Sequence, residues 1–351
     1  MTTTLVIRLS SLGDVALALP VLYSVAQRYP EEHFLLLTRH EWQPLLLNKP
    51  PNLTVLPVDT TGKHKGVRGM LSLLRELLEC VGTKKTKALK VADLHGVIRS
   101  FVLGFYFRLK GTPVAVIDKG RKEKRALVRQ KHKHLQPLKS SLARYQEVFE
   151  KLGYDASLSF TGLCFAGLFP EKPTKECIRI GIAPFSKHPG KTYPVELMEQ
   201  VVSQLHQMSG KKNIDMVLFG SKEERKRVAH WEEKYPTLKG ATRQAPLEEE
   251  LFLLSQMDVV LSMDSANMHL ASLVNTPVVS IWGATHPFAG FYGWNQNPSY
   301  ALQVELPCRP CSVFGNKPCH RKDHACLKHI TPEMVVHKIQ TTLQEMYGVE
   351  L

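Results

Sequence analysis

The sequence contains no run of about 20 consecutive apolar residues, which is the length that a helix needs to cross a bilayer. The best candidate, Val15–Ala26, is too short and contains a proline. The first residues, MTTTLVIRLSS, also lack the basic leader and long apolar core of a secretory signal. We therefore expect a cytoplasmic protein without a transmembrane helix.

Acidic residues are scarce relative to basic ones: 32 Asp and Glu stand against 46 Lys and Arg, a formal net charge of +14. Such an excess implies an anionic partner, which could be a nucleic acid, an acidic lipid surface or a phosphorylated substrate. Much of the excess lies in Gly62–Arg68 and Asp118–His134. These stretches are either a solvated basic surface or a docking surface that brings Lys63 and Arg121 to an anionic acceptor.

No sequence repeat relates the two halves of the chain, yet both alternate short β-rich runs with amphipathic helices. That alternation favours an α/β fold with parallel sheets, and 351 residues exceed what one core usually accommodates. We expect an N-terminal domain over 1–168, a linker in Leu168–Cys177 and a C-terminal domain over 177–330. Residues 331–351 supply a last helix that could pack on either half, including back on the N-terminal domain.

The expected elements form two doubly wound domains. The expected strands are Thr4–Leu9, Phe34–Thr38, Thr54–Val58, Leu89–Asp93, Val114–Ile117, Ile178–Ala183, Asp215–Phe219, Val259–Ser262 and Val278–Trp282. The expected helices are Val15–Arg28, Met70–Cys80, Val97–Leu109, Leu142–Leu152, Val195–Gln207, Lys222–Lys234, Leu247–Gln256, Ala266–Val274 and Pro332–Tyr347. Sheets of this kind bind ligands at the carboxyl ends of their strands, so two of them can face each other across a ligand cleft.

The most informative segment is Asp258–Pro287, DVVLSMDSANMHLASLVNTPVVSIWGATHP. An apolar strand ends near Asp264, and Ser265 stands at the N-cap position of the next helix. Free amides around Ala266 could bind a phosphate at the helix start. Asp264 could accept hydrogen bonds from sugar hydroxyls, and His269 could donate to a phosphate oxygen. Plain helix capping with an interior histidine is the alternative.

Two further strand-end loops carry polar residues. Ala183–Pro194 contains Ser186 and places Lys191 just before a helix, where its ammonium could neutralise a diphosphate. In Val217–Arg225 a glycine turn is followed by acids, and Glu223 could accept hydrogen bonds from ribose hydroxyls. A solvated lysine and ordinary helix-start acids are the alternatives.

One carboxylate lies in the loop between the first strand and the first helix, within Ile7–Pro20 (IRLSSLGDVALALP). Asp14 could cap that helix or act as a base. A carboxylate can remove a hydroxyl proton from hydrogen-bond distance, and a helix start favours its charged form. The two roles are compatible.

Four motifs together resemble the ADP-heptose:lipopolysaccharide heptosyltransferases, glycosyltransferase family nine. They are LSSLGD near residue 10, DLHGVIRS at 93–100, KTYP at 191–194 and DSANMHLASLVNTPVVSIWGATHP at 264–287. The resemblance implies a GT-B architecture, with the acceptor on the N-terminal Rossmann-like domain and the nucleotide-sugar on the C-terminal one. It also implies an inverting, metal-independent transferase that moves a heptose from ADP-heptose to a lipopolysaccharide core or similar glycolipid and requires no cofactor.

The resemblance assigns roles to matching residues. Asp14 matches the general base, and Ser11 and Gly13 share its acceptor-side loop. The residues that match an acceptor-side motif are Asp93, Arg99 and Ser100. The donor-side candidates are Ser186, Lys191 for the diphosphate, Glu223 for the ribose, Asp264 for the transferred sugar, and Ser265, Ala266 and His269 for the phosphates. The departures from the family pattern are Ala266 for glycine, Pro184-Phe185-Ser186 for Pro-Gly-Ala, and Tyr193 for tryptophan.

Four of the seven cysteines cluster in CRPCSVFGNKPCHRKDHAC: Cys308, Cys311, Cys319 and Cys326. In a reducing cytoplasm this spacing is compatible with structural zinc. Reduced cysteines that pack a loop are the alternative, which we favour, and we therefore expect no metal.

The leading hypothesis is thus an enzyme whose partners are a nucleotide-sugar, an anionic glycolipid and, transiently, the inner face of the inner membrane. We interpret the aromatic run Phe101–Leu109 mainly as core packing, with membrane contact as the alternative. Two other classes compete: a GT-B hydrolase or epimerase of nucleotide-sugars, and a basic nucleic-acid-binding protein with a four-cysteine cluster. The sequence shows no recognition helix or stacking motif, so we expect no nucleic acid.

Overall fold

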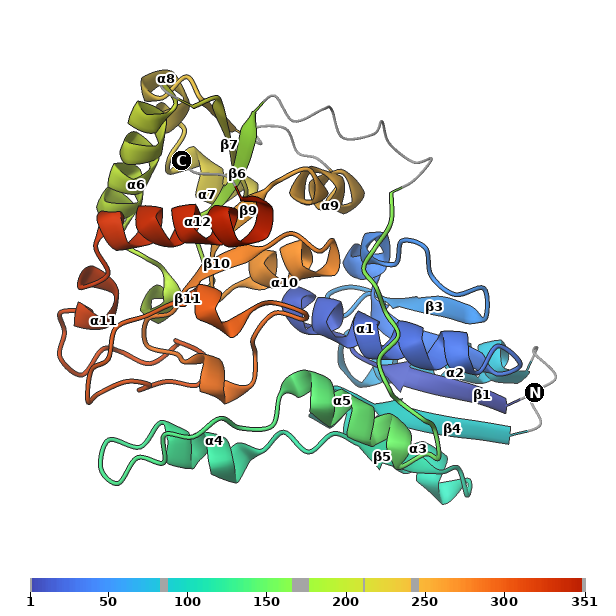
Figure 1. Ribbon diagram of the computed structural model, residues 1–351. Helices are drawn as coiled ribbons and strands as arrows, with labels where there is room; N and C mark the ends of the chain where they lie inside the picture. The colour runs from blue at the N-terminus through green and yellow to red at the C-terminus, as the bar shows by residue number, and fades with distance from the viewer. Residues whose placement is uncertain (1, 83–87, 166–176, 211, 241–245, 349–351) are drawn as a thin grey trace. The chain divides into compact units, whose positions relative to one another are not determined.

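The computed structural model of the chain describes residues 2–82, 88–165, 177–210, 212–240 and 246–348 (Figure 1). The chain forms two compact units, the first made of Met1–Gly120 and Lys139–Gly162, the second of Arg121–Leu138 and Leu163–Leu351. The α/β class with two parallel sheets is confirmed. All but the last residue of the expected linker lie outside the described residues.

The first unit holds, in its described part, a parallel sheet of order β3-β2-β1-β4-β5. Its strands are β1 (Thr2–Ile7), β2 (His33–Arg39), β3 (Leu53–Val58), β4 (Ala88–Asp93) and β5 (Val114–Val116). Its helices are α1 (Leu12–Arg28), α2 (Gly66–Gly82), α3 (Ile98–Leu109) and α5 (Ser141–Glu150), with the 3-10 turn η1 (His40–Leu45).

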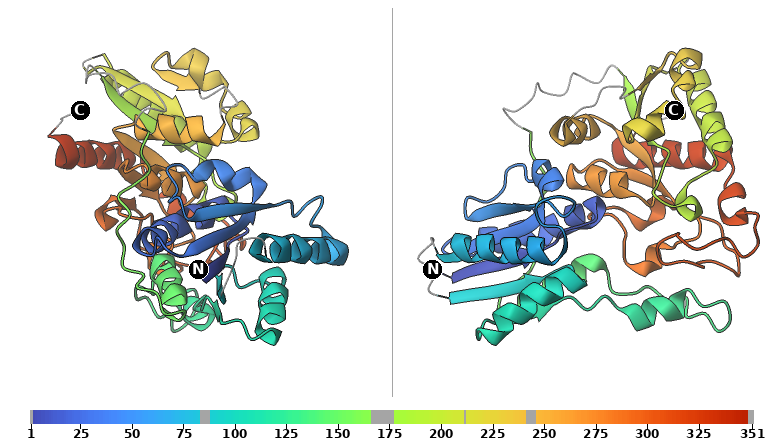
Figure 2. Two further views of the ribbon diagram at one scale, coloured as in Figure 1. Left: turned by 90° about the vertical axis from the view of Figure 1, so that its right-hand side faces the viewer. Right: turned by 180° about the vertical axis from the view of Figure 1, so that it is seen from behind.

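Alternate residues of a strand point to opposite faces of a sheet, and in β1 and β2 nearly all of them are buried, so helices cover both faces of this sheet. Leu5 and Ile7 of β1 belong to an apolar cluster with side chains of α2 and α3. Thr4, on the alternate face, has its hydroxyl 2.6 Å from that of Tyr154, which follows α5. Helices α1 and α5 contact each other. Figure 2 shows α2 and α3 side by side on their face of the sheet.

The second unit holds, as far as it is described, a parallel sheet of order β11-β10-β9-β6-β7-β8. Its strands are β6 (Ile178–Ala183), β7 (Ile214–Leu218), β8 (Leu238–Gly240), β9 (Val259–Met263), β10 (Val278–Ile281) and β11 (Ala301–Leu302). Its helices are α4 (Arg121–Leu127), α6 (Val195–Met208), α7 (Lys222–Lys226), α8 (His230–Lys234), α9 (Leu247–Ser255), α10 (Ala266–Leu273), α11 (Ala325–Lys328) and α12 (Pro332–Tyr347). Its 3-10 turns are η2 (Pro189–Lys191), η3 (Pro287–Ala289) and η4 (Pro298–Tyr300).

The segment Arg121–Leu138 groups with the second unit, although the sequence placed it in the N-terminal domain. Specific contacts explain this. The amide of Leu138 donates to the carbonyl of Phe288 at 2.9 Å, and the ammonium of Lys133 donates to the carbonyl of Arg309 at 2.6 Å. The first unit is therefore not the continuous stretch 1–168 that the sequence predicted, because the basic segment 121–138 makes its contacts within the second unit.

The last helix, α12, packs on the second unit, which is one of the two possibilities that the sequence left open. It contacts α6, β9 and β10, and Val335 and Ile339 enter the same apolar core as the strands of that sheet. Its ends are sharply defined. The Thr331 hydroxyl accepts the amide of Met334 at the start, and Gly348 adopts a left-handed conformation after the last turn.

The helices are short or polar relative to the demands of a bilayer. Across the ranges that the structure describes, none of them is both long and apolar enough to pass through a membrane.

Candidate active site

Asp14 lies in the first turn of α1, in the corner that follows β1. The N-cap residue of this helix is Ser11. Its amide and hydroxyl donate to Asp14 Oδ2 at 3.1 and 2.7 Å, and the guanidinium of Arg8 lies 2.8 Å from the same oxygen. Asp14 therefore closes a reciprocal cap of the kind that holds an acid at a helix start. The side chain stays 30% exposed, so this fixed carboxylate remains accessible.

Arg8 is a site residue that the sequence analysis did not single out. It directly follows the buried strand β1 and is itself 6% exposed. Its guanidinium donates to the carbonyl of Leu94 at 2.7 Å and lies over the ring of Tyr145, 5.6 Å from the centroid. The sequence did contain a signal for Arg8, because it is a charged residue at the end of an otherwise apolar strand.

Asp93, at the end of β4, is brought close to this corner by strand pairing. β1 and β4 are neighbours, with Ile7 opposite Asp93. The amides of His95 and Gly96 both donate to Asp93 Oδ1 at 2.8 Å. Asp93 Oδ2 is buried and has no hydrogen-bond partner in the described part of the chain. An acceptor of this kind suits a substrate hydroxyl that arrives from outside.

His95 is the second residue that sequence reasoning missed. Burial, with the positive charges of Arg8 and Lys119, lowers its pKa to about 4. The nearby charge of Asp14 opposes this shift, and that of Arg99 adds to it. The ring is thus neutral at pH 7. It lies among charged side chains that are far apart in the sequence, from Arg8 to Lys119.

The other acceptor-side candidates lie in different segments of the chain. Gly13 is buried within α1. Ser100 is fully buried, and its hydroxyl accepts the amide of Val97 at 3.0 Å, so it caps the start of α3. Lys63 is exposed and pairs with Glu76 at 2.9 Å. Arg121 begins α4 in the other unit.

In the second unit, the loops after the neighbouring strands β6 and β9 bring two predicted residues together. The ammonium of Lys191 lies 3.0 Å from Asp264 Oδ2, and the side chains are 17% and 5% exposed. The amide of Tyr193 contacts the sulfur of Met263 at 3.3 Å, which holds the first loop against the end of β9. Sequence reasoning named both charges and missed that each is the other's partner.

The loop that carries Lys191 is closed by its own hydroxyls. Ser186 Oγ donates to the carbonyl of His188 at 3.1 Å and lies 3.1 Å from the Thr192 hydroxyl. Tyr193 is fully buried, and its hydroxyl donates to the carbonyl of Ile330 at 2.6 Å. Ser186 thus shapes the loop, and Lys191 is the group that the loop presents.

Helix α10 begins directly after Asp264. Its N-cap residue, Ser265, makes no capping hydrogen bond with its side chain within the described residues, and the hydroxyl lies 3.3 Å from that of Ser262. Ala266 is half-buried in the first turn, and His269, one turn in, is 9% exposed. The amides of this first turn point out of an eight-residue helix, where an anion is favoured.

Glu223 lies on the surface of the short helix α7. Its side chain is 79% exposed, and the ammonium of Lys226 is 3.5 Å away. The capping role at this helix start belongs to Glu224, whose carboxylate accepts the amide and hydroxyl of Ser221 at 2.9 Å each.

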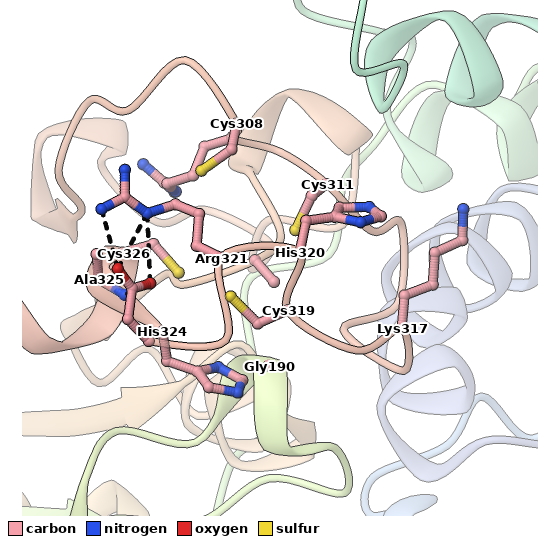
Figure 3. A pocket seen from close by; sticks show the side chains of 13 residues that line it. Gly190, Cys308, Cys311, Lys317, Cys319, His320, Arg321, His324, Ala325 and Cys326 are labelled. Carbon is pink, nitrogen blue, oxygen red and sulfur yellow. Dashed lines mark hydrogen bonds and ion pairs between the residues drawn. The ribbon is translucent and has the colours of Figure 1, made fainter.

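The cysteine-rich segment lines a small open pocket that also has Gly190 on its wall (Figure 3). All four clustered thiols line it: Cys308, Cys311, Cys319 and Cys326. Burial raises the pKa of Cys326 to about 11 and also raises the pKa of Cys311, so both stay protonated at neutral pH. Within the described ranges, no three or more His, Cys, Asp and Glu side chains are arranged to hold a metal ion.

The cysteine-rich segment also supports Lys191, and the spacing of the cysteines did not predict this contact. Gly190 donates its amide to the carbonyl of Gly315 at 3.3 Å. Gly315 has φ +72°, and a Cβ there would lie 2.3 Å from Cγ of Lys191. The absence of a side chain at Gly315 therefore lets the backbone approach the stem of the lysine.

The chain is similar in sequence to known heptosyltransferases. The family model of glycosyltransferase family 9 (heptosyltransferase) matches residues 90–320. The lipopolysaccharide core heptosyltransferase OpsX of Haemophilus influenzae is 25% identical over 299 residues, which cover 80% of this chain and 79% of that protein. Lipooligosaccharide heptosyltransferase 2 of Campylobacter jejuni is 29% identical over 90 residues, a match that spans 27% of its length and 26% of this chain.

The fold is shared with solved structures. The E. coli heptosyltransferase WaaC with ADP-2-deoxy-2-fluoro heptose superposes with a TM-score of 0.67 at 19% identity, covering 97% of this chain and 99% of WaaC. The GT-B fold expected from the sequence is thereby confirmed. Since the family model covers well over half of the chain, this protein belongs to glycosyltransferase family 9.

Proposed function

We propose that the protein transfers a heptose, with inversion, from ADP-heptose to a lipopolysaccharide core or a similar glycolipid. The observation that carries the proposal is the Lys191–Asp264 pair at the start of α10. It places a cation, a carboxylate and outward-facing amides at the strand ends of a Rossmann-like unit, where nucleotides bind. Membership of family 9 and the similarity to WaaC with an ADP-heptose analogue support this donor class.

On the donor side, the proposed roles separate the two charges. The diphosphate takes the electron pair of the glycosidic C–O bond as that bond breaks, and Lys191 with the first amides of α10 offsets the new charge. Asp264 accepts hydrogen bonds from hydroxyls of the transferred sugar. When the donor binds, Lys191 contacts the diphosphate and Asp264 contacts the sugar hydroxyls. These two interactions offset the free energy lost when the ion pair between Lys191 and Asp264 is separated.

On the acceptor side, Asp14 is the general base. Its carboxylate takes the proton of the acceptor hydroxyl while the oxygen attacks the anomeric carbon. Arg8 and Ser11 fix the position of the carboxylate, and the buried Oδ2 of Asp93 would accept a second hydroxyl of the acceptor. Positive groups around His95 suit an acceptor that carries negative charge.

We further propose that transfer needs no metal ion, because Lys191 and the helix start supply the positive charge that a metal would otherwise provide. The reaction would take place in the cytoplasm, at the inner face of the inner membrane, since a glycolipid acceptor is anchored in a membrane. The net charge of +14 supports contact with an anionic lipid surface.

A donor and acceptor panel tests the proposal. Purified protein is given ADP-heptose, UDP-hexoses and GDP-hexoses, and nucleotide release is measured with and without a lipopolysaccharide core acceptor. We expect release from ADP-heptose that depends on the acceptor. Release without acceptor would indicate a hydrolase, and the lack of binding to any nucleotide-sugar would overturn the proposed class.

A further inference from the structure

Exposed apolar side chains concentrate on two neighbouring helices of the first unit. Among the described residues, 13 large hydrophobic side chains are exposed, and eight of them lie on α2 and α3. On α2 they are Val67, Leu71 and Leu78; on α3 they are Ile98, Phe101, Val102, Phe105 and Leu109. Helices α2 and α3 cover the same face of the sheet (Figure 2), and their outer sides, which carry these eight residues, are here named the α2–α3 face.

Helix α3 is apolar on two opposite sides, which explains its long hydrophobic run. Leu103 and Phe107 are 1% and 2% exposed and fill the core beneath the sheet. Phe101 and Phe105, one turn apart on the outer side, are 59% and 50% exposed and stack at 6.2 Å. The core therefore accounts for one side of the helix and leaves the aromatic stack outside.

The charges around the α2–α3 face are mostly positive. Helix α3 contains two arginines and no acidic residue, and Arg108 and Lys110 at its end are exposed. On α2, Arg68 and Arg75 are exposed, together with one exposed acid, Glu79. Aromatic and aliphatic side chains bordered by Lys and Arg are typical of helices that lie in the interface of an anionic bilayer.

We propose that the α2–α3 face docks the protein on an anionic lipid bilayer. Phe101 and Phe105 enter the boundary between headgroups and acyl chains, while Arg108 and Lys110 contact anionic headgroups. A symmetric pair of copies would bring these basic rims together, so charge complementarity favours an anionic surface over a second copy. The inference deepens the proposed membrane-anchored acceptor, and it can be tested without any transfer reaction.

Vesicle flotation with the full-length protein tests the proposal. The probes are phosphatidylethanolamine vesicles with and without phosphatidylglycerol. We expect the wild type to float with the anionic vesicles. The Phe101→Gln/Phe105→Gln variant should bind them at least about tenfold more weakly. The matched control, Leu158→Gln/Met346→Gln, removes two exposed apolar side chains elsewhere and should bind like the wild type. Thermal melting confirms that each variant is folded.

A second pair of variants isolates the charge. Arg108→Gln/Lys110→Gln should lose about tenfold in binding to anionic vesicles, and added salt should reduce this difference. Equal flotation of the Phe101→Gln/Phe105→Gln variant and the wild type would overturn the proposal. So would a wild-type dimer in light scattering that this variant makes monomeric without any change in flotation. If flotation changes as expected while no glycosyl transfer is found, the proposed function fails and the docking face stands.

Discussion

The two units each present a strand, a serine N-cap and an aspartate, but the aspartate lies on opposite sides of the cap. In α1, Asp14 follows Ser11 by three residues and folds back onto its amide. In α10, Asp264 precedes Ser265 and turns to Lys191. The first helix start is therefore occupied by its own carboxylate, whereas the second keeps its first-turn amides available for an anion.

This difference indicates how a shared local motif serves two chemical tasks. A carboxylate inside the first turn is held in a fixed position by the amide and hydroxyl of the cap and by Arg8, as a positioned base requires. A carboxylate one residue before the cap can pair with a lysine and leave the helix dipole to a phosphate. The position of one acid relative to the cap thus distinguishes the proposed acceptor corner from the proposed donor corner.

Replacement of Asp14 by asparagine tests the first corner and should have the largest effect. The asparagine side chain keeps the shape but cannot accept the proton, so kcat should fall by about 10²–10⁴-fold. Calorimetry should show unchanged donor affinity, because the donor groups lie in the other unit. The control, Asp155→Asn, changes an exposed acid paired with Arg28 and should retain full activity. Normal turnover in Asp14→Asn would remove the base assignment.

A double-mutant cycle on Lys191 and Asp264 tests the second corner. Lys191→Met should weaken donor binding by about 10–100-fold and lower thermal stability, because it leaves Asp264 buried without its partner. In Lys191→Met/Asp264→Asn, stability should return while donor affinity stays low. Recovery of donor affinity in the double variant would mean that Lys191 serves only to neutralise Asp264.

Gly315→Ala tests the support of Lys191 by the cysteine-rich segment. The added Cβ would displace the lysine stem, so donor affinity should fall by about fivefold. Gly348→Ala is a matched control, since Gly348 has φ +66° and no described atom within 4 Å of the added one. It carries the same backbone penalty without the contact. Equal donor affinity in both variants would contradict the hypothesis that the cysteine-rich segment positions Lys191.

The buried His95 predicts a pH dependence of stability. Its pKa is about 4 in the folded chain, below the value of about 6.5 expected when unfolded, so the unfolded state binds more protons between these values. The stabilisation from the neutral ring is complete above pH 6.5 and is lost as the pH falls toward 4. Chemical unfolding at pH 5 and pH 7 measures the difference in unfolding free energy between these pH values. His95→Gln should reduce that difference by on the order of 1 kcal/mol. An unchanged slope would show that His95 titrates normally.

Chelation should have the smallest effect of all. If Lys191 and the α10 start supply the positive charge in the transition state, EDTA leaves the rate of nucleotide release unchanged. Inhibition by EDTA that added divalent metal reverses would contradict metal-independent transfer.

Much of the fold could be predicted because buried parallel strands and amphipathic helices leave clear patterns. β6 and α12 lie where the sequence placed them. The expected helix Lys222–Lys234 instead divides into α7 and α8, and the short strands β8 and β11 were missed. Two or three residues in a strand carry no periodicity, so only tertiary pairing reveals them.

For the candidate site, residue types were predictable and partnerships were not. Asp14, Lys191 and Asp264 follow strands, which the sequence indicates. In the first unit, Arg8 and His95 join Asp14 through the pairing of β1 with β4. In the second unit, Gly315 reaches Lys191 from more than 120 residues away. Such contacts depend on the order of strands in the sheet and on the path of long loops, neither of which local spacing encodes.

The placement of Arg121–Leu138 in the second unit has a consequence for how the chain can be assembled. The polypeptide passes between the units three times, after Gly120, after Leu138 and after Gly162. On the ribosome, Lys133 is synthesised long before Arg309, whose carbonyl it contacts. The second unit therefore cannot be completed from its own continuous stretch of sequence, and a fragment that begins at Leu163 would lack part of its surface. Independent expression of the two halves should work only if this segment is supplied to the second.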